Sequence, residues 1–278
     1  MKILSLGYSP CPNDTFMFYG LSCGAVRAQG LAFKERLEDV ETLNNLAMEA
    51  CLDVTKVSCA AFAHLCRHYC LLRAGAALGK NCGPLVVSRK PPKSLASLEG
   101  EKVAMPGRLT TASLLFALYG PRSVRALQMG FHEVMPAVAA GQAEAGVIIH
   151  EGRFTYPSYG LCVVCDLGRL WEEETGLPLP LGAIAARRTL GTETISRLEA
   201  VIRTSIDYGR KNEAEAVRHA RRFAQEMAEG VLRAHIALYV NDLSADIGRQ
   251  GEEAIGALLA RGAERGVLPH LTQTPFLT

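Results

Sequence analysis

The sequence predicts an α/β protein with two lobes and a ligand cleft between them. Segments with strand character alternate with segments of helical periodicity, which favours a mainly parallel α/β architecture. Stretches rich in proline and glycine at 84–92 and 177–184 indicate two crossings between lobes. We therefore expect a large discontinuous lobe of residues 1–90 and 182–278 and a smaller lobe of residues 91–181. Because ligands bind preferentially between domains, the cleft is the expected site.

The first lobe is predicted from short apolar runs, each followed by a turn and a helix. Strands are expected at 2–7, 31–37, 53–57 and 83–88. Two prolines break the chain after the first strand, and Asn13 or Asp14 can cap a helix running toward Leu21. Acidic residues from Glu38 suit the first turn of a second helix, and Ser58 can cap a third helix over 59–69.

The second lobe shows the same alternation, and the end of the chain is helical. Strands are expected at 102–105, 145–149 and 161–166, with helices from Thr111 to Tyr119 and over 131–140. From Thr192 onward, helices are expected at 194–210, 212–228, 229–240 and 246–265. This helical C-terminal region leaves a homodimer possible.

The composition argues against several classes of protein, namely nucleic-acid-binding, secreted and membrane-spanning proteins. The chain has 278 residues, 49% of them hydrophobic and 21% charged, with a net charge of +2. Sparse aromatics and scattered basic residues argue against a nucleic-acid-binding surface. The N-terminal apolar run is too short for a secretory signal, and no run approaches the roughly 20 apolar residues of a membrane span. Nine cysteines, an odd number, suit a reducing compartment, so we expect a cytoplasmic protein.

Two cysteine patterns are not expected to bind metal or act in redox chemistry. His64, Cys66, His68 and Cys70 alternate, but on a helix the two pairs would lie about 200° apart and could not share one ion. Cys162 and Cys165 are three residues apart in an expected strand, which places the two thiols on opposite faces. We therefore expect no metal site.

A catalytic residue is expected where the apolar run 145–149 stops at His150. Ligands of open α/β sheets bind beyond the carboxyl ends of strands, so this imidazole would face the cleft. A mostly neutral histidine can act as a general base. A lone histidine at a strand end is also compatible with a purely structural role.

Three turns between strands and helices favour binding of a small carboxylate. They contain Asn13 and Asp14, Lys56 and Ser58, and Thr110 and Thr111 after Gly107. Free N–H groups at helix N-termini bind anions, although plain helix capping explains any one of these turns equally well. Neither a P-loop nor a Gly-x-Gly-x-x-Gly motif is present, so no nucleotide cofactor is indicated.

Six motifs in a fixed order and spacing carry a family resemblance. They are Ser9–Phe16, Leu37–Asn44, Thr55–Ser58, Pro106–Ala112, Ile148–Tyr156 and Gly176–Ile184. Together they resemble the 1,4-dihydroxy-6-naphthoate synthase family of the futalosine route to menaquinone, in register from residue 1 to about Asn241. Cys59, Phe62 and Leu109 depart from the family pattern.

The resemblance implies a fold similar to type II periplasmic binding proteins and a reaction without metal or organic cofactor. Cyclic dehypoxanthinylfutalosine, a small carboxylate, would be cleaved by a carbon–carbon lyase reaction to 1,4-dihydroxy-6-naphthoate and dihydroxyacetone. The resemblance makes His150 the proton acceptor. The expected substrate contacts are Lys56, Val57, Ser58, Thr110 and Thr111, with Asn13, Asp14 and Arg153 added from the neighbouring motifs.

Other functions on the same scaffold remain as alternatives. Chorismate dehydratase, a sister enzyme of the same pathway, is expected to differ around Pro10–Asp14 and Ile149–Glu151. A non-catalytic solute-binding protein would need an export signal or a lipoprotein cysteine, and Cys11 follows no apolar leader. A ligand-sensing domain of a regulator would need an attached DNA-binding segment.

Overall fold

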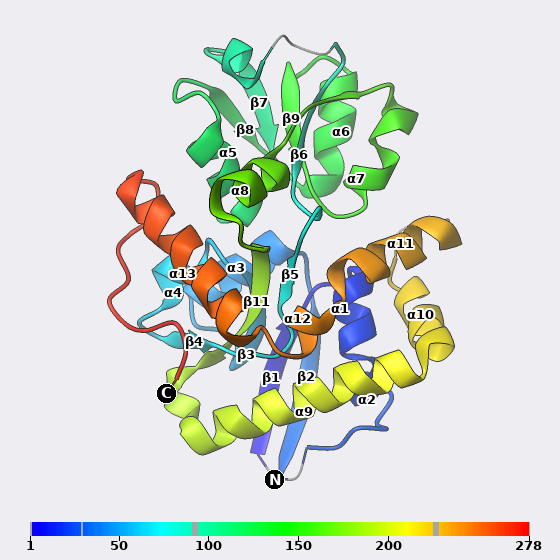
Figure 1. Ribbon diagram of the computed structural model, residues 1–278. Coiled ribbons are helices and arrows are strands. Elements are labelled where there is room, and N and C mark those ends of the chain that lie inside the picture. Colours follow the sequence, from blue (N-terminus) through cyan, green and yellow to red (C-terminus); the bar gives the residue numbers. More distant parts are fainter. Residues whose placement is uncertain (1, 29, 91–93, 225–227, 278) are drawn as a thin grey trace.

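A computed structural model describes residues 2–28, 30–90, 94–224 and 228–277. Two β-sheets with surrounding helices form two lobes, one above the other in Figure 1. The first sheet has six strands in the order β2-β1-β3-β11-β4, with β5 also paired to β11. The second sheet has five strands in the order β10-β6-β9-β7-β8. The predicted two-lobed α/β fold is confirmed.

The strands of the first sheet come from both ends of the chain. In sheet order they are β2 (Leu31–Leu37), β1 (Lys2–Tyr8), β3 (Val54–Ser58), β11 (Leu179–Arg187), β4 (Tyr69–Leu71) and the separately paired β5 (Ala77–Gly79). Leu4 and Leu6 of β1 are buried, as expected for alternating side chains on a packed sheet.

The strands of the second sheet come from the middle of the chain. In sheet order they are β10 (Cys162–Asp166), β6 (Leu85–Ser88), β9 (Ala145–Ile148), β7 (Lys102–Met105) and β8 (Arg125–Gln128). Every residue of β6 and of β9 is buried, which explains the continuous apolar runs in the sequence.

The prediction of mainly parallel pairing was wrong. Strand β1 runs parallel to β2 and β3, and β7 runs parallel to β8 and β9. The antiparallel pairs all involve β6 or β11. Strand β6 follows the crossing into the small lobe, and β11 follows the crossing back into the large lobe. Each of them runs antiparallel to the strands beside it.

The crossings lie close to the predicted places, with shifted boundaries. Strand β5 ends at Gly79 in the first sheet, and β6 begins at Leu85 in the second. The large lobe therefore ends before β6 rather than at residue 90; the prolines at 91–92 lie outside the described residues. On the return, β11 begins at Leu179, so most of 177–184 is a strand rather than a linker.

Helices of the first lobe include a long C-terminal set. They are α1 (Pro12–Met17), α2 (Tyr19–Ser22), α3 (Val40–Met48), α4 (Phe62–Leu65), α9 (Thr192–Lys211), α10 (Glu213–Arg221), α11 (Glu229–Tyr239), α12 (Asp242–Ala245) and α13 (Gly248–Glu264). A 3-10 turn (Arg188–Leu190) precedes α9. Helix α9 buries Ile195, Leu198, Val201 and Ile202, the three- and four-residue spacing of an amphipathic helix.

Helices of the second lobe flank its sheet. They are α5 (Thr111–Tyr119), α6 (Phe131–Ala139), α7 (Gly152–Thr155) and α8 (Leu167–Thr175), with 3-10 turns at Leu95–Leu98 and Tyr156–Tyr159. Helix α8 and strand β8 were not predicted, and the expected helix over 59–69 shrinks to α4 followed by β4. Ala61 rather than Ser58 precedes α4.

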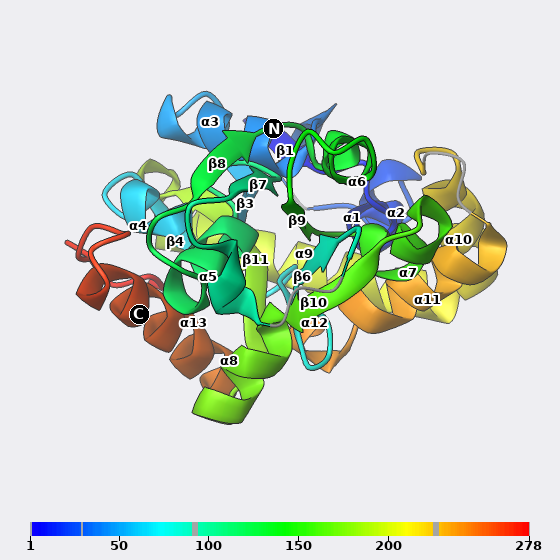
Figure 2. The same ribbon diagram turned by 90° about the horizontal axis from the view of Figure 1, so that it is seen from above.

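Helix α13 of the large lobe contacts the small lobe on one side of the molecule. In two perpendicular views α13 lies opposite α10 and α11 (Figure 1, Figure 2). The Arg261 guanidinium of α13 lies 2.6 Å from Glu174 of α8 and 5.6 Å from the ring centre of the buried Trp171. These contacts link α13 of the large lobe to α8 of the small lobe on this side.

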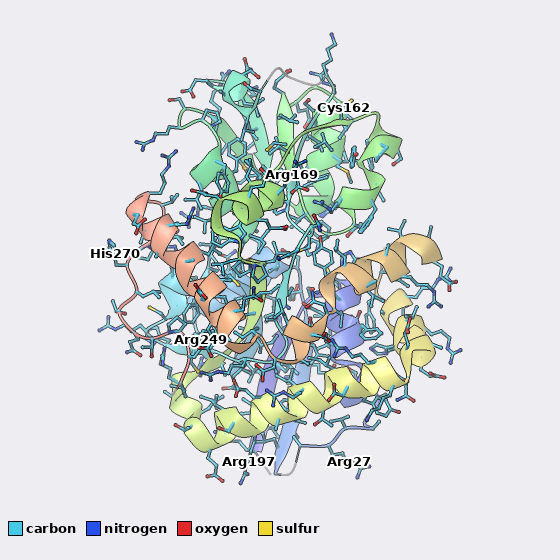
Figure 3. All side chains as sticks on the ribbon, viewed as in Figure 1. Arg27, Cys162, Arg169, Arg197, Arg249 and His270 are labelled. Atoms are coloured by element: carbon cyan, nitrogen blue, oxygen red, sulfur yellow. The ribbon has the colours of Figure 1, made fainter. Side chains whose placement is uncertain are left out.

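Surface side chains relate to two of the sequence-based predictions, which concern the scattered basic residues and the Cys162 and Cys165 thiols. In Figure 3 Arg27 and Arg197 lie at the lower end of the molecule, Arg249 lies at the lower left, and Arg169 lies on the upper lobe. Cys162, labelled on the upper lobe in Figure 3, is exposed, and both it and Cys165 are free thiols. No described helix is long and apolar enough to cross a membrane.

Candidate active site

A cleft with a cavity volume of about 90 Å³ lies where the two lobes meet. Strand ends and turns of both sheets contribute to it, together with Tyr239 from α11. Its lining residues are Ser9, Asn13, Asp14, Val40, Lys56, Ser58, Ala77, Cys82, Pro84, Thr110, Thr111, Ala112, Ile149, His150, Leu181, Gly182 and Tyr239. The structure therefore brings most of the predicted site residues together.

His150 lies just beyond the carboxyl end of β9 and lines this cleft. Its φ angle of +55° is in the left-handed region, which residues with a Cβ rarely adopt. Such strain is retained where surrounding structure fixes it, and it occurs frequently at functional sites. The turn thus directs the imidazole toward the other lobe.

Aromatic rings and a thiol surround the imidazole. The ring of Phe131 meets His150 edge-on, with centroids 4.9 Å apart. Cys11, which precedes α1 in the other lobe, places Sγ 3.3 Å from Nδ1 of His150. Burial lowers the pKa of His150 below its ordinary value; Glu151, Asp14 and Asp39 oppose this shift, and Lys56 reinforces it. The imidazole is therefore neutral near pH 7, the form that a general base requires.

A buried ion pair forms the floor of the site on the large lobe. Lys56 Nζ donates to Asp14 Oδ1 at 2.9 Å and to the Gly75 carbonyl at 3.0 Å. Asp14 also accepts hydrogen bonds from the backbone N–H and hydroxyl of Ser9 and from the Asn13 amide. Both charges are buried and paired with each other, and Lys56 uses two of its three N–H donors here, so the pair is a fixed part of the cleft wall.

His235 of α11 extends this network into the helical region. Its Nε2 lies 3.1 Å from Asn13 Oδ1, and because the Asn13 amide donates to Asp14, Nε2 carries the proton. Its Nδ1 is buried and has no hydrogen-bond partner among the described residues. Burial lowers the pKa of His235 to about 3, and the nearby His150 acts in the same direction. His235 is therefore a neutral imidazole.

Ser58 is held in the cleft by Asn44 of α3. The Ser58 N–H donates to Asn44 Oδ1 at 2.9 Å, and the Asn44 amide donates to Ser58 Oγ at 3.1 Å. Asn44 also donates to Glu41, which accepts from the backbone N–H of Leu109 across the cleft at 3.0 Å. The Ser58 hydroxyl retains its own proton as a donor for a ligand.

The two threonines at the start of α5 have different surroundings. Thr110 caps the helix by accepting from the Ser113 N–H, and its hydroxyl donates to the Gly107 carbonyl at 2.8 Å. The Thr111 hydroxyl donates to the Leu181 carbonyl at 2.8 Å and accepts from the Ala60 N–H, both in the other lobe. Thr111 therefore joins the lobes while lining the cleft.

In each of the three predicted anion-binding turns, a side-chain oxygen of the protein already accepts a hydrogen bond from a backbone N–H. Asp14 accepts from the Ser9 N–H, Asn44 from the Ser58 N–H and Glu41 from the Leu109 N–H. The sequence could not reveal this, because two of these acceptors lie on α3, a different segment from the turns they occupy.

Two predicted contacts lie away from the cleft. Val57 is buried in the core, since it alternates with Lys56 and Ser58 along β3. Arg153 donates to Asp166 at 2.6 Å and to the Gly83 carbonyl at 2.7 Å, so its guanidinium links α7 to the start of α8. Neither residue lines the cleft.

Several site residues were missed from the sequence. Cys11 lies inside a recognised motif, but only the fold shows its sulfur beside His150. His235 and Tyr239 lie in the helical region, 222 residues after Asn13 and 157 residues after Cys82, the residues to which they are hydrogen-bonded. Their four-residue spacing on one face of α11 was an available signal, with ring centroids 4.6 Å apart.

No metal site is formed by the described side chains. Within residues 2–28, 30–90, 94–224 and 228–277, no group of three or more His, Cys, Asp and Glu residues is arranged to hold an ion. His64, Cys66 and Cys70 lie on α4, just after α4 and on β4 rather than along one helix. Cys59 and Phe62, which depart from the family pattern, are buried in the core.

Comparison with known proteins establishes the family. A family model described as menaquinone biosynthesis matches residues 4–264. A 1,4-dihydroxy-6-naphthoate synthase of Thermus thermophilus is 49% identical over 96% of each chain. The enzyme of the same name from Streptomyces coelicolor is 43% identical over 96% of this chain and 95% of its own. The chain belongs to the 1,4-dihydroxy-6-naphthoate synthase family.

Solved structures place this family member among proteins of the periplasmic-binding-protein fold. The crystal structure of protein AF1704 from Archaeoglobus fulgidus is 34% identical, with a TM-score of 0.91 over 96% of this chain and 98% of that one. The alkanesulfonate-binding protein SsuA of Xanthomonas axonopodis, solved with bound MOPS, is 12% identical with a TM-score of 0.73 over 97% and 95%. The second likeness concerns the fold alone.

Proposed function

We propose that this enzyme of menaquinone biosynthesis is a carbon–carbon lyase that converts cyclic dehypoxanthinylfutalosine to 1,4-dihydroxy-6-naphthoate and dihydroxyacetone. The observation that carries the proposal is the neutral, strained His150 in the interlobe cleft of a chain 49% identical to an enzyme named for this product. All nine cysteines are free thiols, which supports the expected cytoplasmic location.

His150 acts in this proposal as the general base. It removes a proton from the substrate, a carbon–carbon bond of the sugar-derived ring breaks, and formation of the aromatic naphthalene drives the reaction forward. A positioned base contributes a factor of about 10² to 10⁴ to the rate. Burial, which lowers the pKa of His150, keeps the imidazole neutral until it takes the proton.

The polar residues of the cleft orient the substrate. Ser58 presents a hydroxyl with a free proton, Thr110 lines the cleft with its hydroxyl bonded to the Gly107 carbonyl, and the buried Lys56–Asp14 pair forms part of the wall. The substrate carboxylate meets no free N–H at Leu109, since Glu41 accepts from that group. Its binding at this turn requires that Glu41 be displaced.

The test is to incubate the purified protein with cyclic dehypoxanthinylfutalosine, without added cofactor, and to follow the products by mass spectrometry and absorbance. We expect 1,4-dihydroxy-6-naphthoate and dihydroxyacetone in equal amounts. Absence of both products, with conversion of chorismate instead, would assign the chain to the sister activity; binding of the compound without turnover would support a solute-binding role.

A further inference from the structure

A chain of side-chain hydrogen bonds runs from His235 of α11 to the ion pair in the cleft wall. His235 Nε2 donates to Asn13 Oδ1 at 3.1 Å, and the Asn13 amide donates to Asp14 Oδ1 at 2.9 Å. Lys56 Nζ donates to the same Asp14 oxygen at 2.9 Å. Asn13, Asp14 and Lys56 line the cleft, whereas His235 is fully buried and does not line it.

The Asp14 carboxylate has no acceptor site left for a ligand. Its Oδ1 accepts from Asn13 and Lys56, and its Oδ2 accepts from the backbone N–H and the hydroxyl of Ser9. A carboxylate has about four acceptor sites, two on each oxygen, and all of them are used here. The groups that this part of the cleft can offer to a ligand are therefore the remaining N–H donors of Asn13 and Lys56.

The Asn13 amide has such a donor to spare. An amide NH2 group carries two N–H donors, and among the described residues only Asp14 accepts from that of Asn13. Because Asn13 lines the cleft, its second N–H is available to an oxygen atom of a bound molecule.

The orientation of the Asn13 amide depends on both of its neighbours. The Asp14 carboxylate can only accept, so the NH2 group must face Asp14, and Oδ1 must face His235. Nε2 of His235 supplies the donor that this buried oxygen needs. A buried oxygen without its donor costs free energy, which rotation of the amide away from this position would relieve.

We propose that His235 is a positioning residue that holds the Asn13 amide with its second N–H directed at an acceptor oxygen of the substrate, a hydroxyl or carbonyl of the sugar-derived ring. This inference rests on the proposed function, which supplies the substrate. His235 acts through Asn13 and does not touch the substrate, since it lies outside the cleft lining. Its loss should therefore weaken substrate binding more than it slows proton removal by His150.

The test compares KM and kcat of His235→Leu and His235→Gln with those of the wild type. Leucine removes the donor, and we expect KM to rise about fivefold to tenfold, the effect of one lost hydrogen bond, with a smaller change in kcat. Glutamine supplies a side-chain N–H in place of Nε2–H, so His235→Gln should recover part of the loss. His219→Leu, which removes an imidazole of α10 that does not line the cleft, is the matched control and should keep the wild-type KM.

A double-mutant cycle shows whether His235 acts through Asn13. Asn13→Ala should raise KM by itself, and adding His235→Leu should raise it no further, because the oxygen that His235 holds is already gone. A merely structural role would lower the folded fraction, and hence the apparent kcat, without changing KM. Additive effects on KM, or a KM of His235→Leu equal to that of the control, would overturn the inference.

A second measurement reads the hydrogen bond without using activity. Nitrogen NMR of protein labelled at histidine, with His235 assigned by its absence in His235→Gln, should show Nε2 protonated and Nδ1 unprotonated. Protonation at Nδ1 would mean that the Asn13 amide faces the other way, and would overturn the inference. Failure of the wild type to turn over the substrate would instead refute the proposed function and leave the NMR test of the Asn13 orientation standing.

Discussion

At the level of single residues, the proposed role of His150 as general base predicts how the rate depends on pH. Burial lowers the pKa of His150, and the wild-type imidazole must be neutral to accept a proton. The acid limb of the kcat/KM profile should therefore have its midpoint below the ordinary histidine value of 6.5. Initial rates across pH 4.5–8.5 measure this directly, and a midpoint above 6.5 would contradict the described surroundings.

The lowered pKa of His235 predicts how the stability of the fold depends on pH. Its folded pKa is about 3, whereas the unfolded chain has the ordinary value of 6.5. Between these values the unfolded state binds the extra proton, so stability is complete above pH 6.5 and falls as the pH drops, by about 1.4 kcal/mol per pH unit for one proton.

The variant His235→Gln removes this titration. Urea unfolding from pH 7 to pH 4 should show the wild type losing its advantage over the variant as the pH falls. A constant difference in the free energy of unfolding across this range would mean that the pKa of His235 is the same in the folded and unfolded protein.

His150 was predictable from the sequence, whereas its partners were not. A titratable residue directly after a buried strand points to the ligand edge of a sheet, and the chain segment itself shows this. Cys11 and His235 reach the site through the fold, from residues separated by 139 and 222 positions from the atoms they contact. Patterns of neighbouring residues in the sequence cannot reveal contacts between such distant positions.

At the level of elements, the turn before α5 depends on a glycine. Gly107 has a φ angle of +128°, and a Cβ there would lie 2.7 Å from the Glu41 carboxyl carbon. Gly107→Ala should therefore lower the free energy of unfolding by about 1–3 kcal/mol. Gly256→Ala, within α13 where an added Cβ meets no atom within 4 Å, should instead stabilise by up to about 1 kcal/mol.

Urea denaturation of the two glycine variants provides the comparison. Equal stabilities would show that the contact between Glu41 and the α5 turn is not formed in solution. Crystals of Gly107→Ala would show whether Glu41 or the backbone moves.

Element boundaries were predicted well where the periodicity was clear and poorly where the chain changes lobe. The buried runs of β1, β3 and β9 appear at the expected places. The prolines of 177–184 predict a linker, yet β11 accommodates Pro180 beside a register shift. Pairing direction could not be inferred, since it depends on which sheet each crossing strand enters.

At the level of the whole molecule, the fold is shared with solute-binding proteins, and the cleft between its lobes contains polar and titratable side chains. Helix α13 and the Thr111 hydroxyl tie the lobes together, and the two faces of the cleft contribute different parts of the site. The large lobe supplies the Lys56–Asp14 pair and Ser58, and the small lobe supplies His150 and Thr110. The chemistry proposed here therefore needs both lobes in contact.

The most direct test of this account is the rate of naphthoate formation by His150→Ala under single-turnover conditions. His270→Ala, whose side chain points outward from the C-terminal tail in Figure 3, is the matched control. The account predicts a rate about 10² to 10⁴ times lower for His150→Ala, with unchanged thermal unfolding, and a wild-type rate for the control. A His150→Ala enzyme that forms the product at nearly the wild-type rate would contradict the account.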